Sequence, residues 1–176
     1  QIATLYAKTS GLDANNRDLR VYALKDSYTN LLAAEKALIL GARGIVVEDT
    51  VSLAQVLAFF EEYPELEDDD YAIDFEVDAV ADTAGNLIEM IARFGDLGYL
   101  DITITGPATV KQLTDIDAST TGTLSYTAIA DVMNNIFPIG GVLTPYIVDG
   151  TDVTIVSGGV ALQHLKAIDT ANGEGK

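Results

Sequence analysis

The feature of this 176-residue sequence that most constrains its fold is a short pattern that occurs three times. In each copy an Asp is followed, one helical turn later, by an Asn and then by Leu or Ile. The Asp and Asn pairs are Asp26 with Asn30, Asp82 with Asn86, and Asp131 with Asn135. The copies lie about 50 residues apart, a spacing typical of tandem structural repeats. Such a repeat favours architectures in which one small unit stacks on the next.

A second marker follows each copy of the first. It is centred on Gln55, Gln112 and His164, and an aromatic residue or Ile stands four positions after each. Two linked markers in a constant order predict that the units share one structure. The opening residues, Gln1 to Leu5, align with Gln112 to Ile116. We therefore expect the chain to begin inside the last helix of a preceding repeat.

Each unit is predicted to form a strand, a helix, a strand and a helix, with the first strand ending just before the Asp marker. Polar or glycine-containing stretches separate the units. The third unit contains Pro138, Gly140, Gly141 and Pro145, which break helices and predict a loop insertion near 137–150. The expected division is 1–17 as the end of a preceding repeat, 18–70 as repeat 1, 71–122 as repeat 2, and 123–176 as the irregular repeat 3.

The predicted strands alternate apolar and polar residues. In the second unit Ile73, Phe75 and Val77 alternate with acidic residues, which is the pattern of a strand buried on one face only. Strands that alternate with helices favour parallel pairing through helical crossovers. Parallel strands covered on both faces would be apolar throughout. The expected fold is therefore α/β, with tandem β-α-β-α repeats that form a solenoid-like, mostly parallel sheet with helices on one face.

Charge and composition exclude several classes of partner. The net charge of −17 disfavours nucleic acid and anionic membranes, because both are bound by clustered Lys and Arg. The absence of cysteine excludes disulfides and thiolate metal sites. No apolar run reaches the roughly 18 residues of a membrane-spanning helix, so we expect no membrane insertion.

The two longest repeat-bearing segments, YALKDSYTNLLAAEKALILGARGIVVEDTVSLAQV and VDAVADTAGNLIEMIARFGDLGYLDITITGPATVKQLTDID, resemble a known class of repeat. They are similar to degenerate α/β repeats of very large secreted bacterial proteins, including cyanobacterial and proteobacterial surface-layer-like proteins and RTX-type adhesins. The resemblance covers nearly the whole chain. It implies an extracellular, structural or adhesive role, often in calcium-rich surroundings, and it supplies no catalytic residues.

The repeated Asp and Asn markers allow two interpretations. Asp and Asn one helical turn apart can form part of a ligand set. Alternatively, the Asp or the residue after it caps a helix, and the Asn bonds a neighbouring backbone. We favour the structural interpretation. His164 stands where the other units have Gln, so we interpret it as a polar helix position rather than a zinc ligand or catalytic base, although its proton could make the site sensitive to pH near neutrality.

Two other places are candidate binding sites. The acidic run Glu67, Asp68, Asp69 and Asp70 could hold calcium, a hard cation that takes several carboxylate oxygens. It is equally the composition of a solvated connector. Phe137, Pro138 and Tyr146, in the irregular third unit, are candidates for binding a partner, because an insertion on one face of a repeat often carries binding.

These observations favour a structural or adhesive repeat segment of a large extracellular or cell-surface bacterial protein. Its partners would be neighbouring repeats or copies of itself, and its only candidate cofactor is calcium. The alternative is a receptor- or ligand-binding module of a secreted protein or toxin, whose partner would be a cell-surface receptor or polysaccharide. No constellation of residues in the sequence predicts an enzyme.

Overall fold

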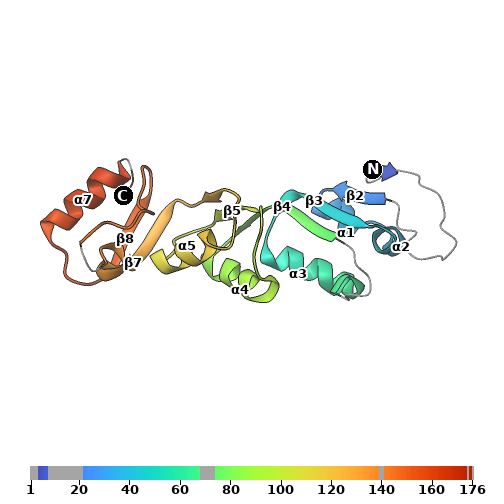
Figure 1. Ribbon diagram of the computed structural model, residues 1–176, viewed down its shortest axis with the longest axis horizontal. Coiled ribbons are helices and arrows are strands. Elements are labelled where there is room, and N and C mark those ends of the chain that lie inside the picture. Colours follow the sequence, from blue (N-terminus) through green and yellow to red (C-terminus); the bar gives the residue numbers. More distant parts are fainter. Residues whose placement is uncertain (1–3, 8–21, 68–73, 139–140, 174, 176) are drawn as a thin grey trace. The chain divides into compact units, whose positions relative to one another are not determined.

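The computed structural model describes residues 4–7, 22–67, 74–138, 141–173 and 175 (Figure 1). The fold is α/β, and every strand pairing described in it except the first is parallel. The chain divides into two compact units, 1–80 and 81–176, and the division falls inside one long strand. The expected three-repeat division places its boundaries elsewhere and stays a prediction.

The described residues of unit 1 form four strands that lie in chain order. Strand β2 is parallel to β3, and β3 is parallel to β4. A β-bulge between Val47 and Thr50 interrupts the pairing of β3 with β4. The elements are β1 (Thr4–Ala7), β2 (Tyr22–Asp26), α1 (Tyr28–Leu32), α2 (Lys36–Leu40), β3 (Gly44–Val51), α3 (Leu53–Glu62), the 3-10 turn η1 (Pro64–Glu67) and β4 (Asp74–Asp82).

The core of unit 1 forms where α3 packs against the sheet. Its buried face presents Leu53, Val56 and Phe59. The Phe59 ring lies 4.9 Å from that of Tyr63 and 5.2 Å from that of Phe75 on β4. Aromatic rings at these separations combine a large buried apolar area with favourable edge and face contacts. The aromatic cluster therefore fixes α3 on the inner face of β4.

Unit 2 begins with the last residues of β4. Its parallel pairs are β5 with β6 and β7 with β8, and helices α4 and α5 pack against each other. Two isolated bridges, Gly98 with Thr120 and Ala108 with Ile129, continue the parallel pairing outside the named strands. The elements are α4 (Ala84–Phe94), β5 (Asp101–Ile104), α5 (Val110–Asp117), β6 (Leu124–Ser125), β7 (Ala128–Val132), α6 (Met133–Ile136), β8 (Asp152–Ser157) and α7 (Leu162–Asn172).

The expected burial of one strand face is confirmed. On β5, Ile102 and Ile104 are buried whereas Asp101 and Thr103 are exposed. Polar residues that alternate with apolar ones along or beside the other strands are exposed as well: Asp74, Glu76, Asp78, Thr105, Ser125, Thr127 and Thr154. In unit 1, the exposed face holds Lys25, whose Nζ lies 3.7 Å from a Glu48 carboxylate oxygen and 3.5 Å from one of Asp78.

Two predictions about local structure are wrong. Thr4–Ala7 forms β1, antiparallel to β2, where the alignment of the opening residues predicted a helix. Thr, Leu and Tyr all favour strands, and β2 offers an edge whose backbone groups need partners. The helix expected from Leu31 to Gly41 is divided into α1 and α2, because Glu35 adopts an extended backbone between them.

Tyr22 explains where α2 ends. Its hydroxyl donates a 2.9 Å hydrogen bond to the carbonyl oxygen of Leu38, and a Cβ at Gly41 would collide with the same hydroxyl. Glycine is therefore required at this close approach. The helix that follows β7 is short, as expected: α6 ends at Ile136.

Candidate functional site

The three Asp and Asn markers form the same hydrogen-bonded clasp. In the first, Asp26 Oδ1 accepts from the Ser27 backbone N–H at 2.7 Å and from Asn30 Nδ2 at 2.7 Å. In the second, Asp82 Oδ1 accepts from the Thr83 N–H and Asn86 Nδ2, again at 2.7 Å each. In the third, Asp131 Oδ1 accepts from the Val132 N–H at 2.7 Å and Asn135 Nδ2 at 2.8 Å. Each clasp joins the end of a strand to the first turn of the following helix.

The residue after each Asp, not the Asp itself, is the helix N-cap. Ser27 and Thr83 accept from the backbone N–H groups of Asn30 and Asn86 through their hydroxyls, at 3.3 Å in both cases. Val132 caps α6 without a side-chain bond. The Asn side chain bonds the Asp carboxylate rather than a neighbouring backbone group. The markers therefore act as a structural unit within each strand–helix junction.

At two places an Asp carboxylate on a later strand accepts a hydrogen bond from the start of an earlier helix. Asp131 Oδ2, on β7, accepts from the backbone N–H of Val110 at 2.9 Å. Asp49 Oδ2, on β3, accepts from the backbone N–H of Tyr28 at 2.9 Å. Both donors are the first residue of a helix, whose N–H has no partner within the helix. A carboxylate placed there also interacts favourably with the positive end of the helix dipole.

The second markers are capping boxes. Ser52 and Gln55 at the start of α3, and Thr109 and Gln112 at the start of α5, exchange the two reciprocal bonds of this motif. The N-cap hydroxyl accepts from the backbone of the Gln, and the Gln side chain accepts from the N-cap backbone. Helix α7 has Ala161 at the N-cap and no side-chain cap bond, so His164 occupies the Gln position without a box.

His164 is instead stacked on Phe137. The two ring centroids are 4.6 Å apart with an angle of 23° between the planes. His164 Nδ1 is buried and has no hydrogen-bond partner among the described residues. Pro138 beside this stack is exposed. The stack joins the loop after α6 to the first turn of α7.

Tyr146, the third predicted partner-binding residue, has a different environment. Its ring lies 6.4 Å from that of Tyr126, in an edge-on arrangement. The Tyr126 hydroxyl donates to the Tyr146 carbonyl oxygen at 2.7 Å, and the Tyr146 hydroxyl donates to Asp117 at 3.2 Å. Burial raises the pKa of Tyr126, with smaller contributions from Tyr146 and Asp117 in the same direction. Tyr146 therefore anchors the loop on unit 2.

The acidic run Glu67 to Asp70 lies almost wholly outside the described residues. Only the backbone of Glu67, at the end of η1, is described. Within the described ranges no group of three or more His, Asp or Glu side chains is placed to hold a metal ion. Calcium binding by Glu67, Asp68, Asp69 and Asp70 stays a prediction.

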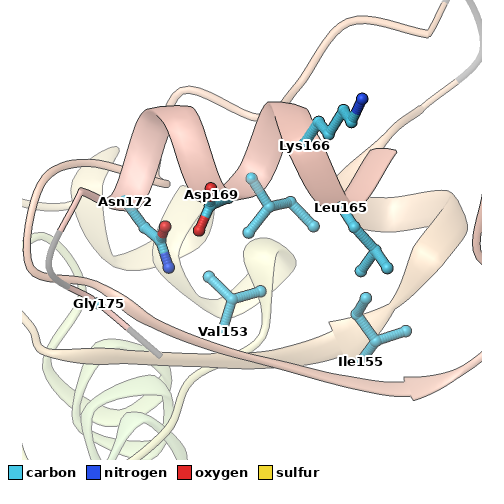
Figure 2. Close-up of a pocket in the computed structure, with 8 residues that line it drawn as sticks. Val153, Ile155, Leu165, Lys166, Asp169, Asn172 and Gly175 are labelled. Carbon is cyan, nitrogen blue, oxygen red and sulfur yellow. The ribbon is translucent and has the colours of Figure 1, made fainter. Parts of the chain in front are cut away.

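A groove lies between β8 and α7. Its volume is about 390 Å³, and its apolar lining includes Val153, Ile155, Leu165 and Ile168 (Figure 2). Figure 2 shows Asp169 and Asn172 of α7 directed towards the strand, whereas Lys166 points away from it. Asn172 is buried and donates to the Thr151 carbonyl oxygen at 3.3 Å, but its Oδ1 has no partner among the described residues.

Sequence-equivalent positions on α5 and α7 differ sharply in burial. Leu113, the residue after the Gln of the α5 capping box, is fully buried, whereas Leu165, the residue after His164, is 47% exposed. Leu162, at the first position of α7, is 67% exposed. The corresponding first residue of α5, Val110, is half-buried. Helix α7 therefore has the spacing of apolar residues expected of a covered helix, although Leu162 and Leu165 are exposed.

The search for relatives adds no assignment. Comparisons of the chain with protein-family models, curated proteins and solved structures found no match. Among the helices of the described residues, none is long and apolar enough to cross a membrane.

Sequence reasoning located the markers but missed part of what they contact. The role of Asp49 was missed because Asp49 lies inside β3, outside the repeated pattern, and its partner Tyr28 is 21 residues away in sequence. The β8–α7 groove was missed because apolar spacing predicts a buried face whether or not a neighbour covers it. The signal that could have found it is Ala161, an N-cap that breaks the capping-box pattern.

Proposed function

We propose that this chain is a structural and adhesive repeat segment of a large extracellular or cell-surface bacterial protein, in which β-α-β-α units stack as a solenoid and act through contact with neighbouring repeats or copies. The observation that carries the proposal is the clasp, which recurs with the same bonds at Asp26, Asp82 and Asp131. The similarity of the sequence to surface-layer-like and adhesin repeats supports the secreted location.

The clasps make the strand–helix junction of each unit rigid. A charge-assisted hydrogen bond holds each Asn to its Asp, so the angle between strand and helix is set locally in each unit. The second carboxylate oxygen of Asp131 then bonds the preceding helix. Local bonds within a unit and carboxylate bonds between successive elements are what a stacked array needs, since each unit in such an array is stabilised mainly by its neighbours.

Self-association is the direct test. Sedimentation velocity over a wide range of protein concentration, in millimolar calcium and separately in EDTA, measures the mass of the particle. A mass that rises with concentration is the expected result. A constant monomer mass in both solutions would contradict the self-assembly role and favour the alternative below.

The alternative is a receptor- or polysaccharide-binding module. Its supporting observation is the loop between α6 and β8, where Val142 is 72% exposed. Exposed apolar side chains on an insertion are typical of binding surfaces. Replacing Val142 with Ser should abolish retention on a cell-surface ligand if the module binds through this loop. The same change should leave self-association intact.

Calcium is proposed as the cofactor only at the acidic run Glu67 to Asp70. A ligand that binds the folded state alone raises the melting temperature with its concentration. Replacing Asp68, Asp69 and Asp70 together with Asn should remove any rise in melting temperature that calcium produces. An unchanged rise in that variant would place the calcium elsewhere.

A further inference from the structure

The β8–α7 surface is open on the side that the groove faces. Leu162 and Leu165 are exposed on α7, and Val156 on β8 is 59% exposed. Among the described strands β8 pairs only with β7. An unpaired strand edge beside apolar side chains is a template for pairing with another strand. We call this surface, formed by β8 and α7, the tail.

The same chain shows what covers an equivalent surface. Helix α5 packs against α4, which precedes it, and against β7 and α6, which follow it, and Leu113 and Ile116 are fully buried. The elements that follow α5 supply part of this cover. The covering element is a strand that ends in the Asp of a clasp, followed by a short helix. Its Asp131 carboxylate accepts the N–H of Val110, the first residue of α5. The first residue of α7, Leu162, is the equivalent donor.

The unit formed by β2 and α1 has the matching features. Asp26 ends β2, and its Oδ1 accepts both bonds of the clasp, whereas among the described residues no helix N–H donates to its Oδ2. Tyr28 stands at the position that Met133 occupies in the unit covering α5. Among the strands that the structure describes, β2 pairs on the side away from β3 with the four-residue antiparallel β1 alone. We call the surface formed by β2 and α1 the head.

We propose that the tail of one copy docks on the head of a second copy of this chain. Strand β8 takes the place of β1 beside β2, and the Leu162 N–H donates to Asp26 Oδ2. The exchange replaces the four-residue pairing of β1 with a pairing of up to five residues, because β2 is five residues long and β8 is six. Head and tail are different surfaces, so the contact is heterologous and generates an open filament unless rotation closes a ring. The proposal rests on the proposed function, because it names the surfaces through which the chain self-associates.

The net charge of the chain determines how association should depend on salt concentration. Each copy carries a formal charge of −17, so two copies repel each other at low ionic strength. Salt screens that repulsion over a distance of about 10 Å at 0.1 M. Association through an apolar tail should therefore strengthen as salt is added, whereas association through ion pairs would weaken.

The first experiment compares two variants by sedimentation equilibrium at several salt concentrations. Leu165→Glu places a charge in the tail, and Val142→Glu makes the same change at an exposed residue in the loop. Leu165→Glu is expected to weaken association by roughly tenfold or more, because burying Leu contributes about that much. Val142→Glu should match the wild type. Both side chains are exposed, so circular dichroism should show both variants folded.

The second experiment maps the partner surface. A photo-crosslinking benzoylphenylalanine at position 162 of the full chain is activated, and the products are mapped by mass spectrometry. Crosslinks to residues 22–32 of a second copy are the expected result, and the same probe at position 142 should not label that segment. Crosslinks from 162 to the α7 segment of the second copy would overturn the proposal in favour of a symmetric dimer.

The outcomes separate this contact from the broader function. If the wild-type chain associates but Leu165→Glu has no effect, or the 162 probe labels neither β2 nor α1, the head-to-tail contact is wrong and self-assembly stands. If the wild-type chain remains monomeric at every salt concentration, both the contact and the self-assembly role are wrong.

Discussion

Helices α5 and α7 carry the same predicted marker but differ in how they start and in how much of their apolar face is buried. Helix α5 starts with a complete capping box, receives a carboxylate from β7, and buries Leu113 and Ile116. Helix α7 starts at Ala161 without a side-chain cap, and Leu165 is half-exposed. The apolar positions of the two helices agree, so the difference arises from their neighbours.

The spacing of apolar residues along a helix therefore does not tell whether the apolar face of that helix is covered by another element. In α5 the covering strand and helix follow in the same chain. Among the described residues, the equivalent face of α7 lies beside β8, where Ile168 is buried but Leu165 is half-exposed. In a repeat array, the stability of a unit comes from its own packing and from contact with its neighbours. The stability of the two helices should therefore respond differently to the same substitutions.

The largest expected difference comes from removing the equivalent leucines. Leu113→Ala should lower the free energy of unfolding of unit 2 by about 2–5 kcal/mol, because it leaves a cavity in a close-packed core. Leu165→Ala should lower it by less than about 1 kcal/mol, because the side chain is already half in water. Urea unfolding of each variant monitored by circular dichroism measures both. Equal losses would mean that α7 is covered in solution.

A smaller effect is expected at the carboxylate that holds α5. Asp131→Asn keeps one oxygen for the clasp but replaces the acceptor of the Val110 N–H with a donor. Leaving that buried N–H unpaired should cost about 1–3 kcal/mol. Asp26→Asn is the matched control, since no bond to Asp26 Oδ2 is described, and in the monomer it should cost less. Similar losses in chemical unfolding of the two variants would contradict the role of the second oxygen.

Removing the N-cap side chain of α5 or adding one to α7 should reduce the difference in stability between the two helices. Thr109→Ala should destabilise unit 2 by about 1 kcal/mol by removing the α5 cap. Ala161→Ser should stabilise it by up to about 1 kcal/mol, because Ala161 already has the extended backbone of an N-cap. Thermal unfolding of the two single variants gives the sign of each change. A melting temperature lowered by Ala161→Ser would show that the His164–Phe137 stack excludes a capped start.

The smallest effect concerns acid. The pKa of Asp26 lies below its ordinary value of 3.8, chiefly because Asn30 Nδ2 donates to the carboxylate and secondly because the Ser27 N–H does. The stability from this carboxylate is present above pH 3.8 and is lost as the pH falls through the lower pKa of the folded state. Asn30→Ala should raise the pKa towards 3.8, as measured by NMR titration of the Asp26 carboxyl carbon. If the pKa of Asp26 is the same in Asn30→Ala, the hydrogen bond from Asn30 is not what lowers it.

Much of the local structure could be predicted from the sequence. The alternation of Ile102 and Ile104 with polar residues identified a strand with one buried face, and the recurring Asp, Asn and Gln identified helix starts. These signals depend on neighbours within one or two turns of the chain. The split between α1 and α2 was missed because it lies at Glu35, which adopts an extended backbone although Glu by itself favours a helix.

Apart from β1 and the division of α1 from α2, the sequence by itself determined the order of strands and helices and the inward faces of the strands, because those depend on periodicity and local hydrogen bonding. Only the tertiary structure decided that the Asp131 carboxylate uses one oxygen for its own helix and the other for the preceding one. It also decided that α7, unlike α5, is left open. Both properties depend on which element lies alongside another in space, and apolar spacing carries no record of that neighbour.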